Sequence, residues 1–162
     1  MPVTDVETDI DNRTLTITAE FAAPPERIWQ VYADPRQLEQ VWGPPTHPAT
    51  FVDHDLRPGG RAHYYMTSPE GEKYYGWWAI VSVDEPKGFT FEDGFAADDS
   101  FEAAPGMPVS HNDYAFEPTG AGTRAVFTST FDSAEGLQQV LEMGVVEGAT
   151  TAINQIDALV AS

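Results

Sequence analysis

The sequence predicts an α+β domain in which a curved antiparallel sheet of about six or seven strands wraps around a long C-terminal helix. Three observations support this prediction. Strand-like apolar runs fill most of residues 14–131. Short turn sequences rich in Gly and Pro separate these runs, and short connections favour antiparallel pairing. Residues 133–161 then carry apolar side chains at helical spacing.

The chain has the length of a single domain, because its 162 residues lie within the roughly 100 to 200 residues typical of one domain. No internal repeat or low-complexity linker divides it, so we expect residues 14–162 to form one domain. Residues 1–13 are acidic and alternate charged with polar or aliphatic side chains. We interpret them as a tail, with an edge strand as the alternative.

The first strand and two short helices follow from local patterns. Residues 14–21 alternate strictly between apolar and polar side chains, which predicts a strand with one face in water. Pro24 and Pro25 end this strand and open a helix, because proline is tolerated in the first helical turn. A second short helix is expected at residues 35–41, and the Trp-Gly-Pro-Pro sequence that follows ends it.

The rest of the chain predicts a meander of strands and one helix. Residues 96–108 are rich in small, acidic and proline residues, so we interpret them as a mobile loop. Residues 133–161 predict one continuous helix, capped by Asp132 or Ser133 and about 40 Å long. The remaining strands are expected at residues 49–55, 61–67, 73–83, 89–93, 109–117 and 123–131.

The composition excludes several functions. The chain has no Cys, which excludes disulfides, thiol nucleophiles and zinc-thiolate sites. Eight Lys and Arg residues against 26 Asp and Glu residues give a net charge of -18. Such a charge repels polyphosphate backbones and anionic lipid surfaces, so we expect neither a nucleic acid nor a membrane as a partner.

The acidic, lysine-poor composition is also typical of halophilic proteins, which stay soluble in concentrated salt because screening cancels self-repulsion. The alternative is an acidic protein of a mesophilic organism. The N-terminus lacks the basic start and apolar centre of a signal peptide, so we expect a cytoplasmic protein.

Four segments resemble a known superfamily: residues 22–45, the Arg-Pro-Gly-Gly turn at 57–60, residues 66–78 and residues 141–162. Together they are similar to the SRPBCC or START-like superfamily, and most similar to the branch named after the C-terminal domain of the activator of Hsp90 ATPase. The resemblance implies a helix-grip fold of the START or Bet v 1 type, with an apolar cavity between the sheet and the C-terminal helix. It does not imply one chemistry, because this superfamily includes lipid carriers, cyclases and hydrolases.

Large apolar side chains are the candidates for lining such a cavity, since ligand sites are mostly apolar with few polar anchors. Ordinary core packing is the alternative for each of them. Both faces of residues 73–83 are apolar, so the sequence leaves open which face lines the cavity. Gly144 and Gly148 either let a strand approach closely or leave volume for a ligand. The candidate ligand-binding residues are Trp42, Tyr64, Met66, Trp77, Trp78, Phe91, Tyr114 and Met143.

Candidates for acid/base chemistry in the cavity are His63, His111 and Glu147, because imidazole and a buried carboxyl group titrate near neutral pH. For each, a surface or satisfied position is the alternative. The four histidines do not have the spacing of helical metal ligands, and no phosphate-binding or nucleophile motif occurs. We therefore expect no metal and no cofactor.

Three functional hypotheses follow. The first is the binding of a small hydrophobic molecule by a monomer or homodimer, with residues 96–108 as a lid. The second is an acid/base enzyme of the cyclase or hydratase kind acting in the same cavity. The third, an activator of a chaperone ATPase, follows only from the family resemblance, and we do not expect a chaperone partner.

Overall fold

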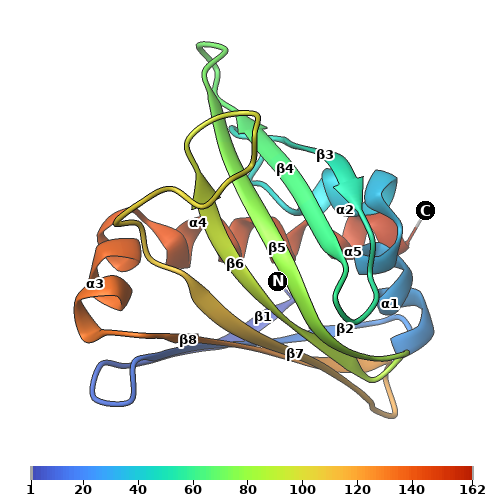
Figure 1. The fold of residues 1–162 in the computed structure, drawn as a ribbon. Coiled ribbons are helices and arrows are strands. Elements are labelled where there is room, and N and C mark those ends of the chain that lie inside the picture. The colour runs from blue at the N-terminus through green and yellow to red at the C-terminus, as the bar shows by residue number, and fades with distance from the viewer. Residues whose placement is uncertain (1, 162) are drawn as a thin grey trace.

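An eight-stranded antiparallel sheet curves around the C-terminal helices in the computed structural model, which describes residues 2–161 (Figure 1). The strands lie side by side in the order β1-β2-β8-β7-β6-β5-β4-β3. This arrangement confirms the predicted α+β class. The strands are β1 (Val3–Asp9), β2 (Thr14–Phe21), β3 (Ala49–His54), β4 (Arg61–Thr67), β5 (Lys73–Asp84), β6 (Gly88–Ala96), β7 (Ser110–Pro118) and β8 (Thr123–Phe131).

The acidic N-terminal segment forms the edge strand β1, although a tail was our preferred interpretation. β1 pairs antiparallel with β2. The Val3 N–H donates to the Asn154 side-chain oxygen at 3.1 Å, and Val3 and Val6 pack against the core. The acidic residues of β1 face water, and charges on an edge strand disfavour pairing with another chain.

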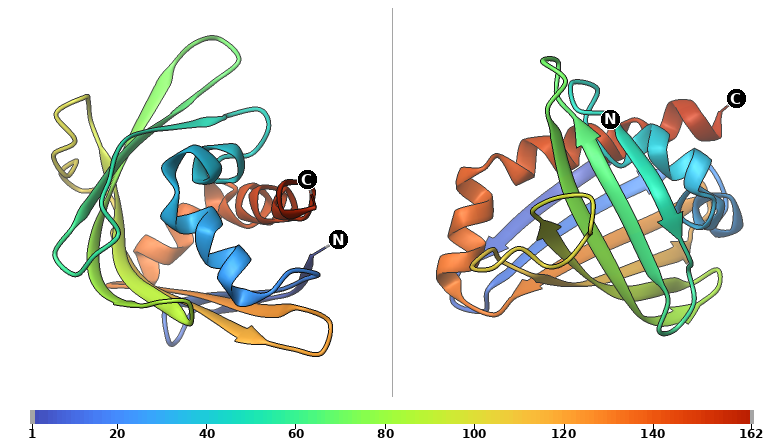
Figure 2. Two further views of the ribbon diagram at one scale, coloured as in Figure 1. Left: turned by 90° about the vertical axis from the view of Figure 1, so that its right-hand side faces the viewer. Right: turned by 45° about the horizontal axis from the view of Figure 1, so that its top comes forward.

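Two short helices connect β2 to β3, and Figure 2 shows them on the concave side of the sheet. Helix α1 (Pro25–Ala33) begins at the predicted proline, and helix α2 (Pro35–Val41) has the predicted bounds. The Asp34 side chain caps α2 by accepting the Arg36 backbone N–H at 2.9 Å. Both helices bury their apolar faces in the core, as the spacing of their apolar residues predicts.

The C-terminal region is not the single continuous helix that its periodicity predicts. It consists of α3 (Ala134–Glu142), α4 (Val145–Asn154) and α5 (Ile156–Val160). Gly144 adopts a left-handed conformation with φ of 87°, which ends α3 and is accessible to glycine because it has no Cβ. α3 therefore stands at one end of the sheet, while α4 and α5 run along its concave side (Figure 1).

The core lies between the concave face of the sheet and the helices (Figure 2). It is rich in aromatic rings that meet edge to face or tilted, such as Trp78 with Trp42 at a centroid distance of 4.9 Å. Among residues 2–161, no helix is long and apolar enough to cross a membrane.

Candidate ligand-binding cavity

A cavity of about 360 Å³ lies between the concave face of the sheet and the helices. Strands β2, β4, β6, β7 and β8 form one wall, and helices α3 and α4 form most of the other. Tyr32 of α1, Val41 of α2 and the adjacent Trp42 complete it. Most of the lining side chains are apolar. Of the described residues that line it, Asp93 alone carries a formal charge, and none is Lys, Arg or His.

The structure brings part of the predicted ligand-binding set to this cavity. Trp78 and Phe91 belong to the concave side but pack into the core, with ring centroids 4.3 Å apart, so they support the wall without lining it. Met143 is 55% exposed, which places it at the opening. The predicted residues that line the cavity are Trp42, Tyr64, Met66, Tyr114 and Met143.

Trp77 lies on the opposite, convex face of the sheet, because neighbouring residues of a strand point to opposite faces. Its indole N–H donates to the Phe95 carbonyl at 3.2 Å, and its ring covers Gly94, where a Cβ would collide with it. Trp77 is therefore not among the residues that line this cavity. The sequence leaves this point open because Trp77 and Trp78 are adjacent aromatic residues in one strand.

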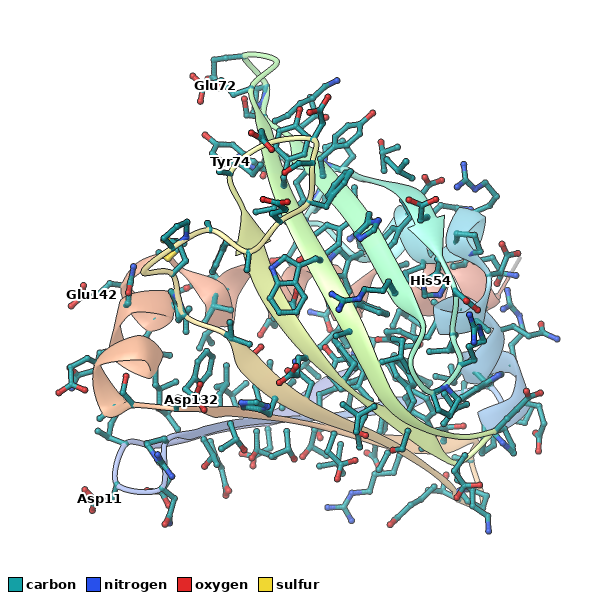
Figure 3. All side chains as sticks on the ribbon, in the orientation of Figure 1. Asp11, His54, Glu72, Tyr74, Asp132 and Glu142 are labelled. Atoms are coloured by element: carbon teal, nitrogen blue, oxygen red, sulfur yellow. The ribbon has the colours of Figure 1, made fainter. Side chains whose placement is uncertain are left out.

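The three candidate acid/base residues all lie outside the cavity lining. His63 Nδ1 is 3.0 Å from Asp53, and His111 contacts two surface carboxylates, one of which belongs to Asp132, labelled in Figure 3. Glu147 is exposed on α4. None of these three side chains is thus positioned to exchange protons inside this cavity.

The loop after β6 does not cover the cavity as the lid hypothesis requires. Phe101 stacks on His63 with a centroid distance of 4.8 Å and an interplanar angle of 14°, and it contacts Tyr75 edge to face. These contacts hold residues 97–109 against the convex face. Pro108 is the one residue of this segment that reaches the cavity lining.

Asp93 is the charged group that the sequence analysis missed. It lies on β6, and its carboxyl Oδ1 accepts a hydrogen bond from the Tyr64 hydroxyl at 2.9 Å. Burial raises the pKa of Asp93 to about 7, and the Tyr64 hydrogen bond acts in the opposite direction. The alternation of Phe89, Phe91 and Phe95 along β6 was the available signal, because it places Asp93 on the same face as three phenylalanines.

The position of Tyr64 depends on a glycine in the neighbouring strand. Tyr64 on β4 pairs with Gly76 on β5, and a Cβ at Gly76 would collide with the Tyr64 ring. The bare backbone of Gly76 lets the ring lie flat across β5 toward Asp93. Burial, together with the adjacent Asp93 charge, raises the pKa of Tyr64 well above its usual range, so its hydroxyl remains a hydrogen-bond donor.

A second polar group lies beside Asp93 and is internally satisfied. Asn112 is buried, and its amide donates to the Ser110 hydroxyl at 3.0 Å. The Ser129 hydroxyl donates to the Asn112 carbonyl oxygen at 2.6 Å, and the Ser110 hydroxyl donates to the Asp93 backbone carbonyl at 3.4 Å. This network stabilises the cavity wall and holds the backbone of β6 next to Asp93.

The two helix glycines behave differently. Gly144 is required by its left-handed backbone, as described above. Gly148 on α4 lines the cavity, and a Cβ built there would meet no atom within 4 Å. Of the two interpretations offered for Gly148, the structure supports free volume, because no strand packs closely on it.

The geometry is that of an apolar cavity with one titratable anchor and no cationic group. In the described part of the chain, no three His, Asp or Glu side chains converge in an arrangement that would hold a metal ion. The enclosed carboxyl group can accept or donate a hydrogen bond near neutral pH, depending on whether it carries its proton.

Comparison with known proteins gives the family. The family model described as "Activator of Hsp90 ATPase homolog 1-like protein" matches residues 22–161. The chain belongs to this family. The AHSA1-like match covers every strand and helix of the domain except β1 and β2, and β2 contributes Leu15 and Ile17 to the cavity lining.

Solved structures with the same fold include two with substantial sequence identity. The AHSA1-like chain is similar to protein Ms6760 from Mycobacterium smegmatis, with 66% identity over 98% of this chain and 96% of that one, at a TM-score of 0.90. A protein from Arthrobacter aurescens shows 43% identity over 98% of this chain and 92% of that one, at a TM-score of 0.93. The AHSA1 protein from Silicibacter pomeroyi shows 26% identity over 91% of this chain and 97% of that one, at a TM-score of 0.70. Among curated proteins, no sequence matches.

Proposed function

We propose that the protein binds a small hydrophobic or aromatic molecule in the cavity between the sheet and helices α3 and α4. The observation that carries this proposal is the cavity itself, with a volume of about 360 Å³ and mainly apolar walls. Ligand sites have volumes of roughly 300 to 1,000 Å³ and combine apolar walls with a few polar groups. The flat rings of Trp42, Tyr64 and Tyr114 suit a ligand that contains a ring.

Gly148 argues against the alternative that the cavity is only an imperfectly packed core. Glycine in a helix interior costs about 1 kcal/mol relative to alanine. A larger side chain at this position would meet open space, so packing alone does not require glycine. Its presence keeps the cavity wall next to Ala149 and Val145 free for a ligand.

Native mass spectrometry of freshly purified protein tests the proposal, with identification of any small molecule that leaves on denaturation. We expect a bound apolar compound in the wild type. Gly148→Leu should abolish this binding without lowering the melting temperature, because the new side chain fills the cavity from the helix side. Thr151→Leu, which adds a similar side chain at an exposed position of the same helix, is the matched control and should retain the ligand.

A ligand that survives in Gly148→Leu would contradict the assignment of the cavity as the binding site. A wild-type chain without a ligand that also shows no thermal shift with aromatic or lipid compounds would contradict the proposed function itself.

A second candidate function, acid/base catalysis in the same cavity, is favoured by the pKa of Asp93. A group with a pKa of about 7 can both accept and donate a proton at neutral pH, which is the property that general acid/base catalysis requires. For the cyclase or hydratase hypothesis, Asp93 therefore replaces His63, His111 and Glu147 as the candidate acid/base residue. If the identified ligand is turned over, Asp93→Asn should abolish turnover even at a saturating ligand concentration.

The chaperone-activator hypothesis rests only on the description of the family. We do not extend it to this chain, because the cavity supports a small-molecule ligand directly.

A further inference from the structure

We propose that the ligand is an apolar or aromatic molecule with a protonated amine, and that the Asp93 carboxylate is the counter-ion of this ammonium group. The inference rests on the proposed function of the cavity and names the class of ligand. It excludes fatty acids and other carboxylates as preferred ligands.

The charges of the cavity are the first reason. Among its described lining residues are one carboxyl group and no Lys, Arg or His. An anionic ligand would lose its hydration without gaining a counter-charge, which is costly in an apolar site. The net charge of the chain, -18, adds a field that attracts cations and repels anions.

The free acceptor on Asp93 is the second reason. Oδ1 accepts the Tyr64 hydroxyl at 2.9 Å, and no group among residues 2–161 donates a hydrogen bond to Oδ2. Tyr64 thus orients the carboxylate of this cavity-lining residue and leaves its second oxygen without a donor from residues 2–161. An ammonium group has three donors and no acceptor, so it matches a carboxylate oxygen better than a hydroxyl or carbonyl group does.

Aromatic rings next to the carboxylate are the third reason. Trp42 and Tyr64 line the cavity with their ring centroids 5.8 Å apart and their planes at 80°. Tyr114 on the adjacent strand β7 also lines it. Burial is the main cause of its raised pKa, and the charges of Tyr32 and then Asp93 add to the effect. A cation within about 6 Å of such ring faces is attracted by their π electrons.

The proposal predicts a specific pH dependence. Asp93 must be ionised to pair with an ammonium group, so amine affinity should rise with pH up to about 7, near the Asp93 pKa, and then level off. The titratable groups that face Asp93 are Tyr64 on β4 and Tyr114 on β7, and burial raises both pKa values well above the usual range. They stay neutral between about pH 6 and 8, and α4 contributes no charged group to the lining, so Asp93 alone should set the dependence.

Isothermal titration calorimetry with three compounds that share one ring system tests the proposal. The probes are 2-naphthylmethylamine, 2-naphthylmethanol and 2-naphthoate, which are cationic, neutral and anionic. At pH 8 we expect the amine to bind about tenfold to a hundredfold more tightly than the alcohol, in line with the strength of a charged hydrogen bond, and naphthoate not to bind. Between pH 8 and 6 the amine should lose about tenfold in affinity and the alcohol should lose none.

Two variants locate the effect. Asp93→Asn should remove the preference for the amine and keep the binding of the alcohol, because the asparagine oxygen can still accept from Tyr64. Glu92→Gln removes the same charge from the adjacent residue of β6, which faces the convex side, where Glu92 contacts His111 at 3.3 Å. This control should keep the full preference for the amine.

The outcomes separate the two proposals. If the alcohol or naphthoate binds as tightly as the amine and Gly148→Leu abolishes that binding, the cavity is a ligand site but the amine proposal is wrong. An equal loss of amine affinity in Asp93→Asn and Glu92→Gln would also overturn it, since the effect would then come from overall charge. If none of the three compounds binds the wild type, the amine proposal is overturned, whereas the proposed function is overturned only if the wild type also carries no ligand and shows no thermal shift with aromatic or lipid compounds.

Discussion

The concave and convex faces of strands β4 to β7 carry similar residues and have different chemistry. On β6, Asp93 faces the cavity, whereas the adjacent Glu92 pairs with His111 on the outside at 3.3 Å. On β5, Trp78 is fully buried, and the adjacent Trp77 covers Gly94 on the outside. Successive side chains of a strand point to opposite faces. Two adjacent residues can therefore lie one in the cavity and the other on the surface.

The comparison shows how environment changes the behaviour of one residue type. Burial raises the pKa of Asp93 to about 7. The convex carboxylates remain in water, where ion pairs contribute at most about 1 kcal/mol to stability. Asp93, which has no cationic partner, can therefore bind a ligand, whereas the ion-paired carboxylates of the convex face cannot do so in the same way. Figure 3 shows the labelled acidic residues Asp11 and Glu142 at the periphery of the molecule.

The largest effect should come from adding one methyl group under the Tyr64 ring. Gly76→Ala would place a Cβ inside the van der Waals radius of that ring, and we expect a loss of about 3 kcal/mol in unfolding free energy, at the upper end of overpacking effects. Urea denaturation measures it. Gly120→Ala, at a turn with open space around it, is the control, and its stability should stay within about 0.5 kcal/mol of the wild type.

On the convex face, Gly94→Ala should also destabilise the protein because of the collision with Trp77, but it should leave the Tyr64–Asp93 hydrogen bond in place. If Gly76→Ala unfolds at the same urea concentration as the wild type, the Tyr64 ring does not lie as close to Gly76 as described.

The second prediction concerns pH. The pKa of Asp93 is about 7 in the folded protein and about 4 in an unfolded chain. As pH rises, the unfolded state therefore loses this proton before the folded state does. The raised pKa makes its full contribution to the free energy of unfolding below about pH 4, and this contribution is lost as pH rises to about 7. Asp93→Asn avoids this loss, so at pH 8 it should be more stable than the wild type by about 1 to 3 kcal/mol.

Thermal denaturation between pH 5 and 8 measures this difference, which should grow with pH. Glu92→Gln on the convex face is the matched control and should show no such growth. A constant difference between Asp93→Asn and the wild type over this range would contradict the raised pKa of Asp93.

A smaller effect is expected from the polar network of the cavity wall. Ser129→Ala removes the donor to the Asn112 carbonyl oxygen and leaves a buried acceptor without a partner, which should cost about 1 to 2 kcal/mol. Chemical denaturation measures it. Asn112→Leu combined with Ser129→Ala should recover part of this loss. No recovery in the double variant would mean that packing, and not the hydrogen bond, dominates at this position.

The smallest effect should be found on the convex face. His111→Gln removes contacts with Glu92 and Asp132, and because these groups are exposed we expect a change of no more than about 0.5 kcal/mol. Ligand binding should not change. A loss of ligand binding in His111→Gln would mean that His111 contributes to the binding site, and that the two faces do not differ in function as described.

The local structure of this protein follows from patterns of neighbouring residues. Strict alternation defined β2, and prolines at the first helical position defined the start of α1 and α2. Turn sequences placed the strands from β3 to β8, and the superfamily resemblance supplied the architecture that connects them. These features depend on neighbouring residues in the chain, which is why they can be predicted without tertiary contacts.

Periodicity failed where a local conformation interrupted a continuous pattern. Apolar residues continue at helical spacing from Leu141 to Val145, and yet the left-handed Gly144 between them ends one helix and starts another. The predicted strand at residues 89–93 was too short, because β6 extends to Ala96. Its alternation beyond Asp93 was the missing sign that a carboxyl group shares the face of Phe95.

The choice of the strand face that forms the cavity depends on tertiary contacts. Alternation defines two faces, but the direction in which the sheet curves and the side on which α4 packs depend on contacts between residues far apart in the chain. That choice placed Tyr64, Asp93 and Asn112 together from three strands, and placed His63, His111 and Trp77 on the outside. The chemistry of the cavity is set by this non-local choice, because burial is what changes the properties of its carboxyl group.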